Sequence, residues 1–144
     1  MSQSIHHEVL IKASAERIYV ALTDAKQFSA FSGGAPAEIS NKDGGTFSMF
    51  GGMISGRNVE LVPAQRLVQA WRAGNWAEGI YSIARFELQA KGSDTLLVFD
   101  HTGFPPENRD DLNGGWTKMY WDPIKKYLGA EREAEGEGGA GASA

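Results

Sequence analysis

The chain has 144 residues, no cysteine and a formal net charge of −4 at pH 7. This length fits one domain with a substantial core, and the lack of cysteine excludes disulfides and zinc–thiolate sites. There is no long apolar run, basic stripe or signal-peptide pattern, so we expect a cytoplasmic protein that binds neither membrane nor nucleic acid.

The first elements in chain order are one strand and two short helices. Apolar and polar residues alternate from Ile5 to Lys12, which predicts a half-buried strand. Ser14 and Asp24 each precede a short helical pattern and are good N-caps. The sequence "SGGAP", residues 32–36, stops the second helix. The apolar faces expected for these helices are Ile18, Ala21, Leu22, Phe28 and Phe31.

A meander of strands follows the helices. Gly51-Gly52 predicts a two-residue hairpin loop, and Gly56 predicts a bulge or a sharp bend. We expect seven strands in all, six of them consecutive, and such a meander curls into a bent antiparallel sheet. The strands of the meander that can be given bounds are Thr46–Phe50, Met53–Val62, Leu67–Arg72, Ile80–Gln89 and Thr95–Thr102.

The last element is a long helix. Its apolar stripe comprises Trp116, Met119, Tyr120, Ile124, Tyr127 and Leu128. Pro123 lies inside this stripe and predicts a kink, because proline removes one helical hydrogen bond and its ring meets the carbonyl four residues earlier. Residues 130–144 contain four Glu, one Arg and no apolar side chain larger than Ala, so we expect a disordered acidic tail.

This element order predicts an α+β fold. A curved seven-stranded antiparallel sheet would wrap a long C-terminal helix, with two short helices after the first strand. The concave face of such a sheet buries the helix stripe and leaves room for a cleft. The domain is expected to span residues 1–129 and the tail residues 130–144.

Four stretches of the sequence resemble one family. They are "GGTFSMFGGMISGRNVELVPAQRLVQAWR", "GNWAEGIYSIARFEL", "HTGFP" and "NGGWTKMYWDPIKKYLG". They are similar to the AHSA-type C-terminal domain of the activator of the heat-shock-protein-90 ATPase, within the START-like (SRPBCC) helix-grip superfamily. The resemblance covers nearly all of the chain from Ile5 to Gly129.

The resemblance implies a chaperone partner, in the setting of a stress response, or an apolar ligand. Eukaryotic activators carry a separate N-terminal domain that makes the main contact with the chaperone, and this chain begins at the first strand of the helix-grip fold. We therefore expect the chain alone to stimulate a chaperone ATPase weakly or not at all. Other members of the superfamily bind lipids, hormones or polyketides in the cleft.

The polar candidates for catalysis are isolated in sequence. His6 and His7 are adjacent on a strand and face opposite sides, so they cannot chelate one metal ion together. His101 could be a polar group at the mouth of the cleft, although a strand-end histidine with one structural partner is the simpler interpretation. Glu60, Glu78 and Glu87 have no partner in a catalytic motif, so no catalytic residue, metal or cofactor is predicted.

The aromatic residues give the most specific hypothesis, since an aromatic cleft can hold an apolar molecule. The residues predicted to line the cleft are Met49, Met53, Trp71, Tyr81, Phe86, Phe99, His101, Trp116 and Tyr120. Trp76, Glu78 and Trp116 are predicted at a rim where an exposed aromatic contacts a partner. The sequence thus favours a non-catalytic binding module. The alternative is an enzyme of the superfamily, similar to polyketide cyclases or hydrolases, acting on a hydrophobic substrate.

Overall fold

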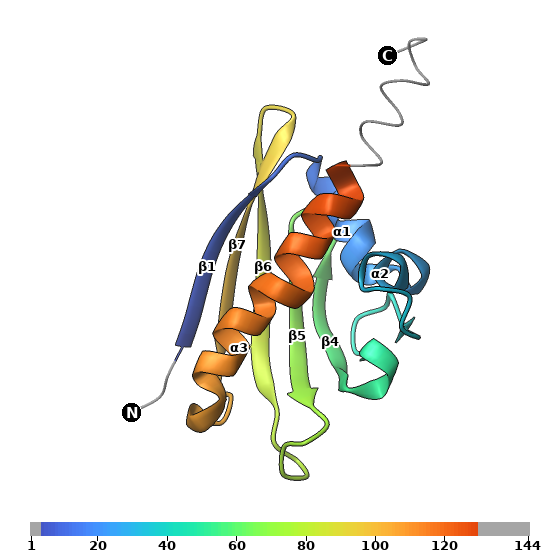
Figure 1. Ribbon diagram of the computed structural model, residues 1–144. Coiled ribbons are helices and arrows are strands. Elements are labelled where there is room, and N and C mark those ends of the chain that lie inside the picture. Colours follow the sequence, from blue (N-terminus) through green and yellow to red (C-terminus); the bar gives the residue numbers. More distant parts are fainter. Residues whose placement is uncertain (1–3, 130–144) are drawn as a thin grey trace.

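The computed structural model describes residues 4–129. Its seven-stranded antiparallel sheet has the order β1-β7-β6-β5-β4-β3-β2 and wraps one long C-terminal helix (Figure 1). The predicted α+β helix-grip fold is confirmed, including the two short helices after the first strand. The acidic tail that was predicted to be disordered lies outside the described residues.

The strands are β1 (Ser4–Ile11), β2 (Glu38–Ile39), β3 (Thr46–Met49), β4 (Ile54–Val62), β5 (Arg66–Ala73), β6 (Ser82–Lys91) and β7 (Asp94–Thr102). The helices are α1 (Ala15–Thr23), α2 (Ala25–Phe31) and α3 (Arg109–Trp116), with short 3-10 turns at η1 (Phe50–Gly52) and η2 (Pro106–Asn108). The helix that begins with α3 continues through a π-helical turn, η3 (Thr117–Trp121), and runs on to residue 129. Within residues 4–129, no helix is long and apolar enough to span a bilayer.

Both predicted helix caps are present. The Ser14 hydroxyl accepts a hydrogen bond from the Arg17 backbone N–H at 3.2 Å, and the Asp24 carboxylate accepts one from Gln27 at 3.0 Å. Each cap satisfies one of the donors that the first turn of a helix leaves without an intrahelical partner. These local contacts start α1 and α2 at the positions that the sequence indicates.

The connection between β3 and β4 differs from the predicted hairpin. Phe50 adopts a positive φ of 55°, Gly51 and Gly52 follow with positive φ, and the Met53 N–H bonds back to the Phe50 carbonyl. The chain therefore forms a 3-10 turn that projects from the sheet, and β4 starts only at Ile54. A positive φ at a bulky residue such as Phe50 is strained backbone.

The predicted bulge at Gly56 is also misplaced. Gly56 pairs in regular register with Trp71, and the register shifts further along, between Asn58 and Glu60. A Cβ atom at position 56 would lie 1.8 Å from the carbonyl oxygen of Ala70. Glycine is thus required there by the close approach of the neighbouring strand.

The C-terminal helix buries most of the predicted stripe but not all of it. Met119 is 44% exposed, so it belongs to the surface. The buried residues of this helix are Trp116, Tyr120, Trp121, Ile124 and Leu128. Pro123 does not interrupt the helix: the π-helical turn η3 precedes it, and the Asp122 N–H bonds five residues back to Thr117. Such a widened turn is a common way to accommodate a proline in a helix.

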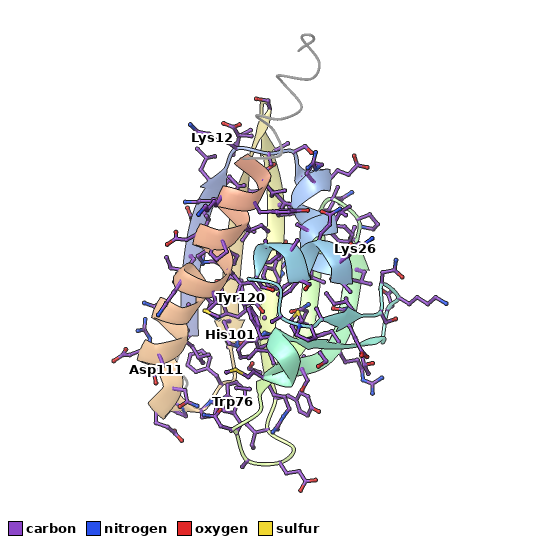
Figure 2. All side chains as sticks on the ribbon, turned by 45° about the vertical axis from the view of Figure 1, so that its right-hand side comes forward. Lys12, Lys26, Trp76, His101, Asp111 and Tyr120 are labelled. Atoms are coloured by element: carbon purple, nitrogen blue, oxygen red, sulfur yellow. The ribbon has the colours of Figure 1, made fainter. Side chains whose placement is uncertain are left out.

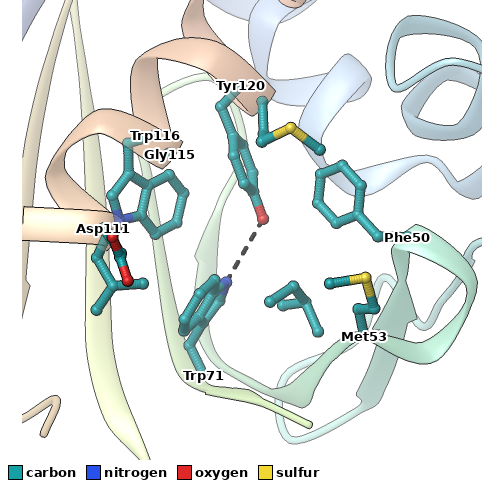
Figure 3. A pocket seen from close by; sticks show the side chains of 10 residues that line it. Phe50, Met53, Trp71, Asp111, Gly115, Trp116 and Tyr120 are labelled. Carbon is teal, nitrogen blue, oxygen red and sulfur yellow. Dashed lines mark hydrogen bonds between the residues drawn. The ribbon is translucent and has the colours of Figure 1, made fainter. Parts of the chain in front are cut away.

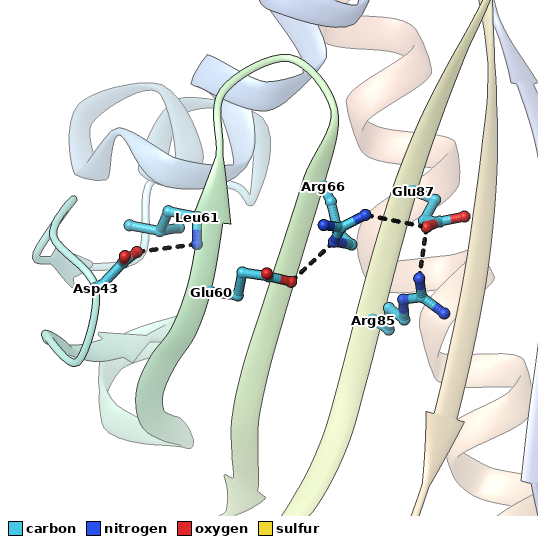
Figure 4. A network of polar contacts seen from close by, with 6 residues as sticks. All are labelled: Asp43, Glu60, Leu61, Arg66, Arg85 and Glu87. Atoms are coloured by element: carbon cyan, nitrogen blue, oxygen red, sulfur yellow. Dashed lines mark hydrogen bonds and ion pairs between the residues drawn. The ribbon is translucent and has the colours of Figure 1, made fainter.

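Glu60 and Glu87 take part in ion pairs on the sheet face away from the helix (Figure 4). Arg66 contacts Glu60 at 2.8 Å and Glu87 at 3.6 Å, and Arg85 contacts Glu87 at 2.6 Å. The Arg66 guanidinium lowers the pKa of the Glu60 carboxyl below its usual value, mainly through this hydrogen bond. These carboxylates are paired and solvated, which suits a surface role.

Candidate functional site

A pocket opens between the η1 turn, strand β5 and the C-terminal helix (Figure 3). Its volume is about 160 Å³. Its walls are almost entirely apolar or aromatic, with the Asp111 carboxylate as the one formal charge among them. The lining residues are Phe50, Met53, Ile54, Trp71, Asp111, Leu112, Gly115, Trp116, Met119 and Tyr120.

The size of the pocket limits what it can hold. Sites for drug-sized ligands usually measure about 300–1,000 Å³, whereas a dry apolar cavity of about 150 Å³ holds one benzene molecule. A pocket of about 160 Å³ therefore matches a single ring or a short branched chain. The lipids and polyketides bound elsewhere in the superfamily are larger than this space.

Tyr120 and Trp121 are adjacent residues of the π-helical turn η3. Both are buried, and their side chains reach different partners. Trp121 turns to His7, to which its indole N–H donates a 2.8 Å hydrogen bond. Tyr120 turns the other way, and its hydroxyl points into the pocket (Figure 3).

The Tyr120 hydroxyl has one protein partner among residues 4–129, the indole N–H of Trp71. The Trp71 Nε1 to Tyr120 Oη distance is 3.5 Å, the long limit for such a bond. Burial raises the pKa of Tyr120 well above its usual value, and the Trp71 hydrogen bond opposes this only in part. The phenol is therefore a neutral group that retains its proton.

His101 is fully buried between the helix and the sheet (Figure 2) and takes part in a chain of hydrogen bonds there. The Trp116 indole N–H donates to His101 Nδ1 at 3.0 Å, so the imidazole proton is on Nε2 and donates to Ser82 Oγ at 2.7 Å. The Ser82 hydroxyl in turn donates to the Trp71 carbonyl at 3.0 Å. Burial lowers the pKa of His101 to about 3, so the ring stays neutral.

This arrangement brings a serine and a histidine together without forming a catalytic pair. A nucleophilic serine must donate its proton to the histidine, whereas here the histidine donates to Ser82. Both residues are fully buried and away from the pocket lining. Within residues 4–129, no group of three His, Asp or Glu side chains is placed to bind a metal ion.

The other two histidines face opposite sides of β1, as predicted. His6 is exposed and contacts Asp100 at 2.7 Å and Glu8 at 2.9 Å, and these hydrogen bonds raise its pKa. His7 faces the helix, where it accepts from Trp121 and its Nε2 lies 2.8 Å from the Asn113 amide oxygen. His7 and His101 thus perform the same task, since each accepts the N–H of a buried tryptophan from the helix.

The nine residues predicted to line the cleft divide into three groups. Four line the pocket: Met53, Trp71, Trp116 and Tyr120. Four are packed into the core and do not line it: Met49, Phe86, Phe99 and His101. The ninth, Tyr81, is 51% exposed beside the Arg72 guanidinium and does not line the pocket. The predicted cleft is therefore mostly solid core with a small pocket at one end.

The predicted aromatic rim is wrong. Trp76 is only 7% exposed and packs on Trp71 with ring centroids 5.7 Å apart, and Trp116 is 2% exposed. Arg72 explains the first result, because its guanidinium donates to the carbonyls of Trp76, Ala77 and Ile80 and folds the loop inward. Glu78 remains exposed at the tip of that loop.

Six lining residues were missed from the sequence: Phe50, Ile54, Asp111, Leu112, Gly115 and Met119. The run "FGGM" at positions 50–53 predicts a turn. It does not predict that the turn projects toward the helix. Gly115 was a second signal, since a small residue on the inner side of a helix leaves space beside it.

Comparison with known proteins identifies the family. The family model for Activator of Hsp90 ATPase homolog 1-like protein matches residues 12–129. Activator of 90 kDa heat shock protein ATPase homolog 1 of Homo sapiens is 31% identical over 81% of this chain and 34% of that protein. Homolog 2 of Mus musculus is 30% identical over 87% of this chain and 38% of that protein. This chain spans about a third of the length of these curated relatives.

Solved structures of similar fold agree with the sequence comparisons. An HSP90 activator from Plasmodium falciparum superposes with a TM-score of 0.82 at 29% identity, covering 88% of this chain and 96% of that one. An Aha1 dimer from Colwellia psychrerythraea gives a TM-score of 0.74 at 21% identity, with 88% and 96% covered, and so shows the fold alone. With its fold, its pocket and the match over residues 12–129, the chain belongs to the family of Activator of Hsp90 ATPase homolog 1-like proteins.

Proposed function

We propose that this chain is a non-catalytic binding module whose pocket holds a small apolar molecule. The observation that carries the proposal is the pocket of about 160 Å³ between η1 and the helix, which apolar side chains line on all sides except at Asp111. An apolar ligand would remove the remaining exposed surface of Met53 and Met119 from water, which is favourable.

The enzyme alternative lacks a reacting group in the pocket. A cyclase or hydrolase needs a base or a nucleophile facing its substrate. The pocket offers a neutral phenol at Tyr120 and a surface carboxylate at Asp111. Ser82 and His101 lie outside the pocket lining. The histidine donates its proton to the serine, whereas a nucleophilic serine would donate to the histidine.

The test compares two adjacent glycines on one helix. A Cβ added at Gly114 or at Gly115 meets no atom within 4 Å, so a side chain can start at either position, and leucine improves helix propensity at both. Only Gly115 lines the pocket, hence Gly115→Leu should fill it and Gly114→Leu should not. Ethylbenzene is titrated into the wild type and both variants while the indole N–H and methionine methyl NMR signals are followed.

We expect saturable shifts at Trp71, Trp116 and Met53 in the wild type and in Gly114→Leu. Gly115→Leu should bind at least about tenfold more weakly, as expected when an anchoring pocket is occupied. The absence of saturable shifts in the wild type, or equal binding by all three proteins, would contradict the proposal.

We further propose that a chaperone of the Hsp90 type is the macromolecular partner. Family membership supports this, as does the likeness to an HSP90 activator over 96% of that chain. With Trp76 and Trp116 buried, the exposed apolar groups around the predicted contact region include Ile80 and Tyr81 beside the Trp76 loop, and Met53 and Met119 at the pocket. Methionine adapts well to varied partner surfaces.

The activity toward the chaperone is expected to be modest. A ligand shifts a conformational equilibrium only by its differential affinity for the two states, and this chain corresponds to about a third of its curated relatives. Titration of residues 1–144 alone against the chaperone of the same organism, followed by phosphate release, should show stimulation below about tenfold, because a single binding surface gains no avidity from tethering. Stimulation well above that level would overturn this expectation.

A further inference from the structure

The Tyr120 hydroxyl is both donor and acceptor, and the protein uses only one of these capacities. The oxygen accepts the N–H of Trp71 at 3.5 Å, while among residues 4–129 no protein group accepts the phenolic proton. Tyr120 is 4% exposed. A buried donor without an acceptor is unfavourable and is uncommon in folded proteins.

The other polar groups of the pocket are already engaged or lie at its edge. The Trp116 N–H is bonded to His101 and the Trp71 N–H to Tyr120, while Asp111 is exposed at the mouth. The phenolic proton is therefore the one donor inside the pocket that a ligand can satisfy. Its surroundings also disfavour an anion, since no cationic side chain lines the pocket and Asp111 is acidic.

We propose that the pocket selects neutral single-ring compounds that carry one hydrogen-bond acceptor, such as an aryl ketone, and that the acceptor binds the Tyr120 hydroxyl. This inference rests on the proposed binding function and adds the ligand class. The ring fills the apolar space between Phe50, Ile54 and Met119, and the carbonyl oxygen accepts the phenolic proton. The long contact between Trp71 and Tyr120 leaves the hydroxyl free to turn toward such an oxygen.

The π-helical turn lies beside the pocket, and turns of this kind are frequent at functional sites. Tyr120 lies within the turn, and its hydroxyl points into the pocket. A phenylalanine at position 120 would fill the same apolar space, so packing alone does not explain a buried hydroxyl here.

The experiment uses two ligands of the same shape. Acetophenone has a carbonyl group where α-methylstyrene has a carbon–carbon double bond, so the two differ mainly in the acceptor. Dissociation constants for both are measured by NMR titration with the wild type, Tyr120→Phe and the control Tyr127→Phe, which lies on the same helix outside the pocket lining. Comparing this ratio between the proteins cancels the difference in ligand hydrophobicity, because that difference enters the ratio of each protein equally.

We expect the ratio of acetophenone to α-methylstyrene dissociation constants to rise about fivefold in Tyr120→Phe, the usual worth of one net hydrogen bond. Tyr127→Phe should leave the ratio unchanged. In the wild type, the carbonyl carbon of ¹³C-labelled acetophenone should move downfield on binding, which reports the hydrogen bond even if Tyr120→Phe fails to fold.

Each failure has a separate meaning. If both ligands bind but Tyr120→Phe leaves the ratio unchanged and the carbonyl signal does not move downfield, the ligand class is wrong and the binding function stands. If neither ligand nor ethylbenzene binds the wild type, both proposals are overturned.

Discussion

The surroundings of His101 and of Tyr120 are built from the same kinds of side chain, yet they differ in how their polar atoms are satisfied. Around His101, each donor and acceptor of the chain from Trp116 to Ser82 has a protein partner. Around Tyr120, one contact is long, the phenolic proton has no protein acceptor among residues 4–129, and space remains. Aromatic side chains are abundant in both regions, so the difference that supports the proposed ligand site is incomplete pairing beside a cavity.

The largest expected effect is a loss of stability, and it tests the region around His101. His101→Ala removes a fully buried ring and leaves the Trp116 N–H without its acceptor. The free energy of unfolding should fall by about 4 kcal/mol, because a cavity and an unsatisfied donor both destabilise. Urea denaturation measures the change.

Met53→Ala is the control for that measurement, since Met53 is 69% exposed at the pocket. It should change the free energy of unfolding by less than about 0.5 kcal/mol while weakening ligand binding. Equal losses of stability for the two variants would remove the distinction between the two regions.

A second test uses pH. Burial lowers the pKa of His101 to about 3, whereas histidine in an unfolded chain titrates near 6.5. Between these values the unfolded state holds a proton that the folded state does not, so the free energy of unfolding decreases as the pH falls. We expect a loss of about 1.5 kcal/mol from this residue between pH 6.5 and pH 5.

His6 provides the internal control, with the opposite sign. Asp100 and Glu8 raise its pKa, so its contribution to stability is present below pH 6.5 and is lost as the pH rises through the folded value. In NMR spectra the ring signals of His101 should stay constant from pH 7.5 to 4.5 while those of His6 titrate above 6.5. A His101 ring that titrates near 6.5 would show that its region is open.

The smallest expected effect separates stability from ligand binding in the region around Tyr120. Gly114→Ala and Gly115→Ala should each raise the free energy of unfolding by roughly 0.5–1 kcal/mol, because alanine favours the helix and neither Cβ meets an obstacle. Only Gly115→Ala narrows the pocket and should weaken ligand binding. Calorimetry gives the stability change and titration the affinity, and a loss of affinity in Gly114→Ala would place the pocket wall elsewhere.

The local parts of the fold could be predicted from sequence. Ser14 and Asp24 cap their helices because capping depends on residues within one turn. The strand patterns of the sheet and the burial of Ile124 and Leu128 follow from periodicity alone. The two-residue strand β2 could not be placed, because so short a strand exists only through its pairing with β3.

The candidate site was less predictable because it depends on contacts between distant residues. Trp76 is buried because the Arg72 guanidinium donates hydrogen bonds to carbonyls of the loop. No sequence pattern in the loop predicts these hydrogen bonds. Phe50 takes a positive φ that its residue type disfavours. Tyr120 was predicted on the inner side of the helix from its spacing after Trp116, but the burial of the adjacent Trp121 was not predicted.

The π-helical turn in the C-terminal helix has a consequence for insertions and deletions. The buried positions Trp116, Tyr120, Trp121, Ile124 and Leu128 include one adjacent pair, Tyr120 and Trp121, which lies in the π-helical turn. Without Trp121 the spacing would become four, three and four, which a straight α-helix satisfies. The ring of Pro123 would then meet the carbonyl four residues earlier. A chain shortened by one residue here would thus need a second substitution at the proline before it folded well, which couples the length of this turn to the residue at position 123.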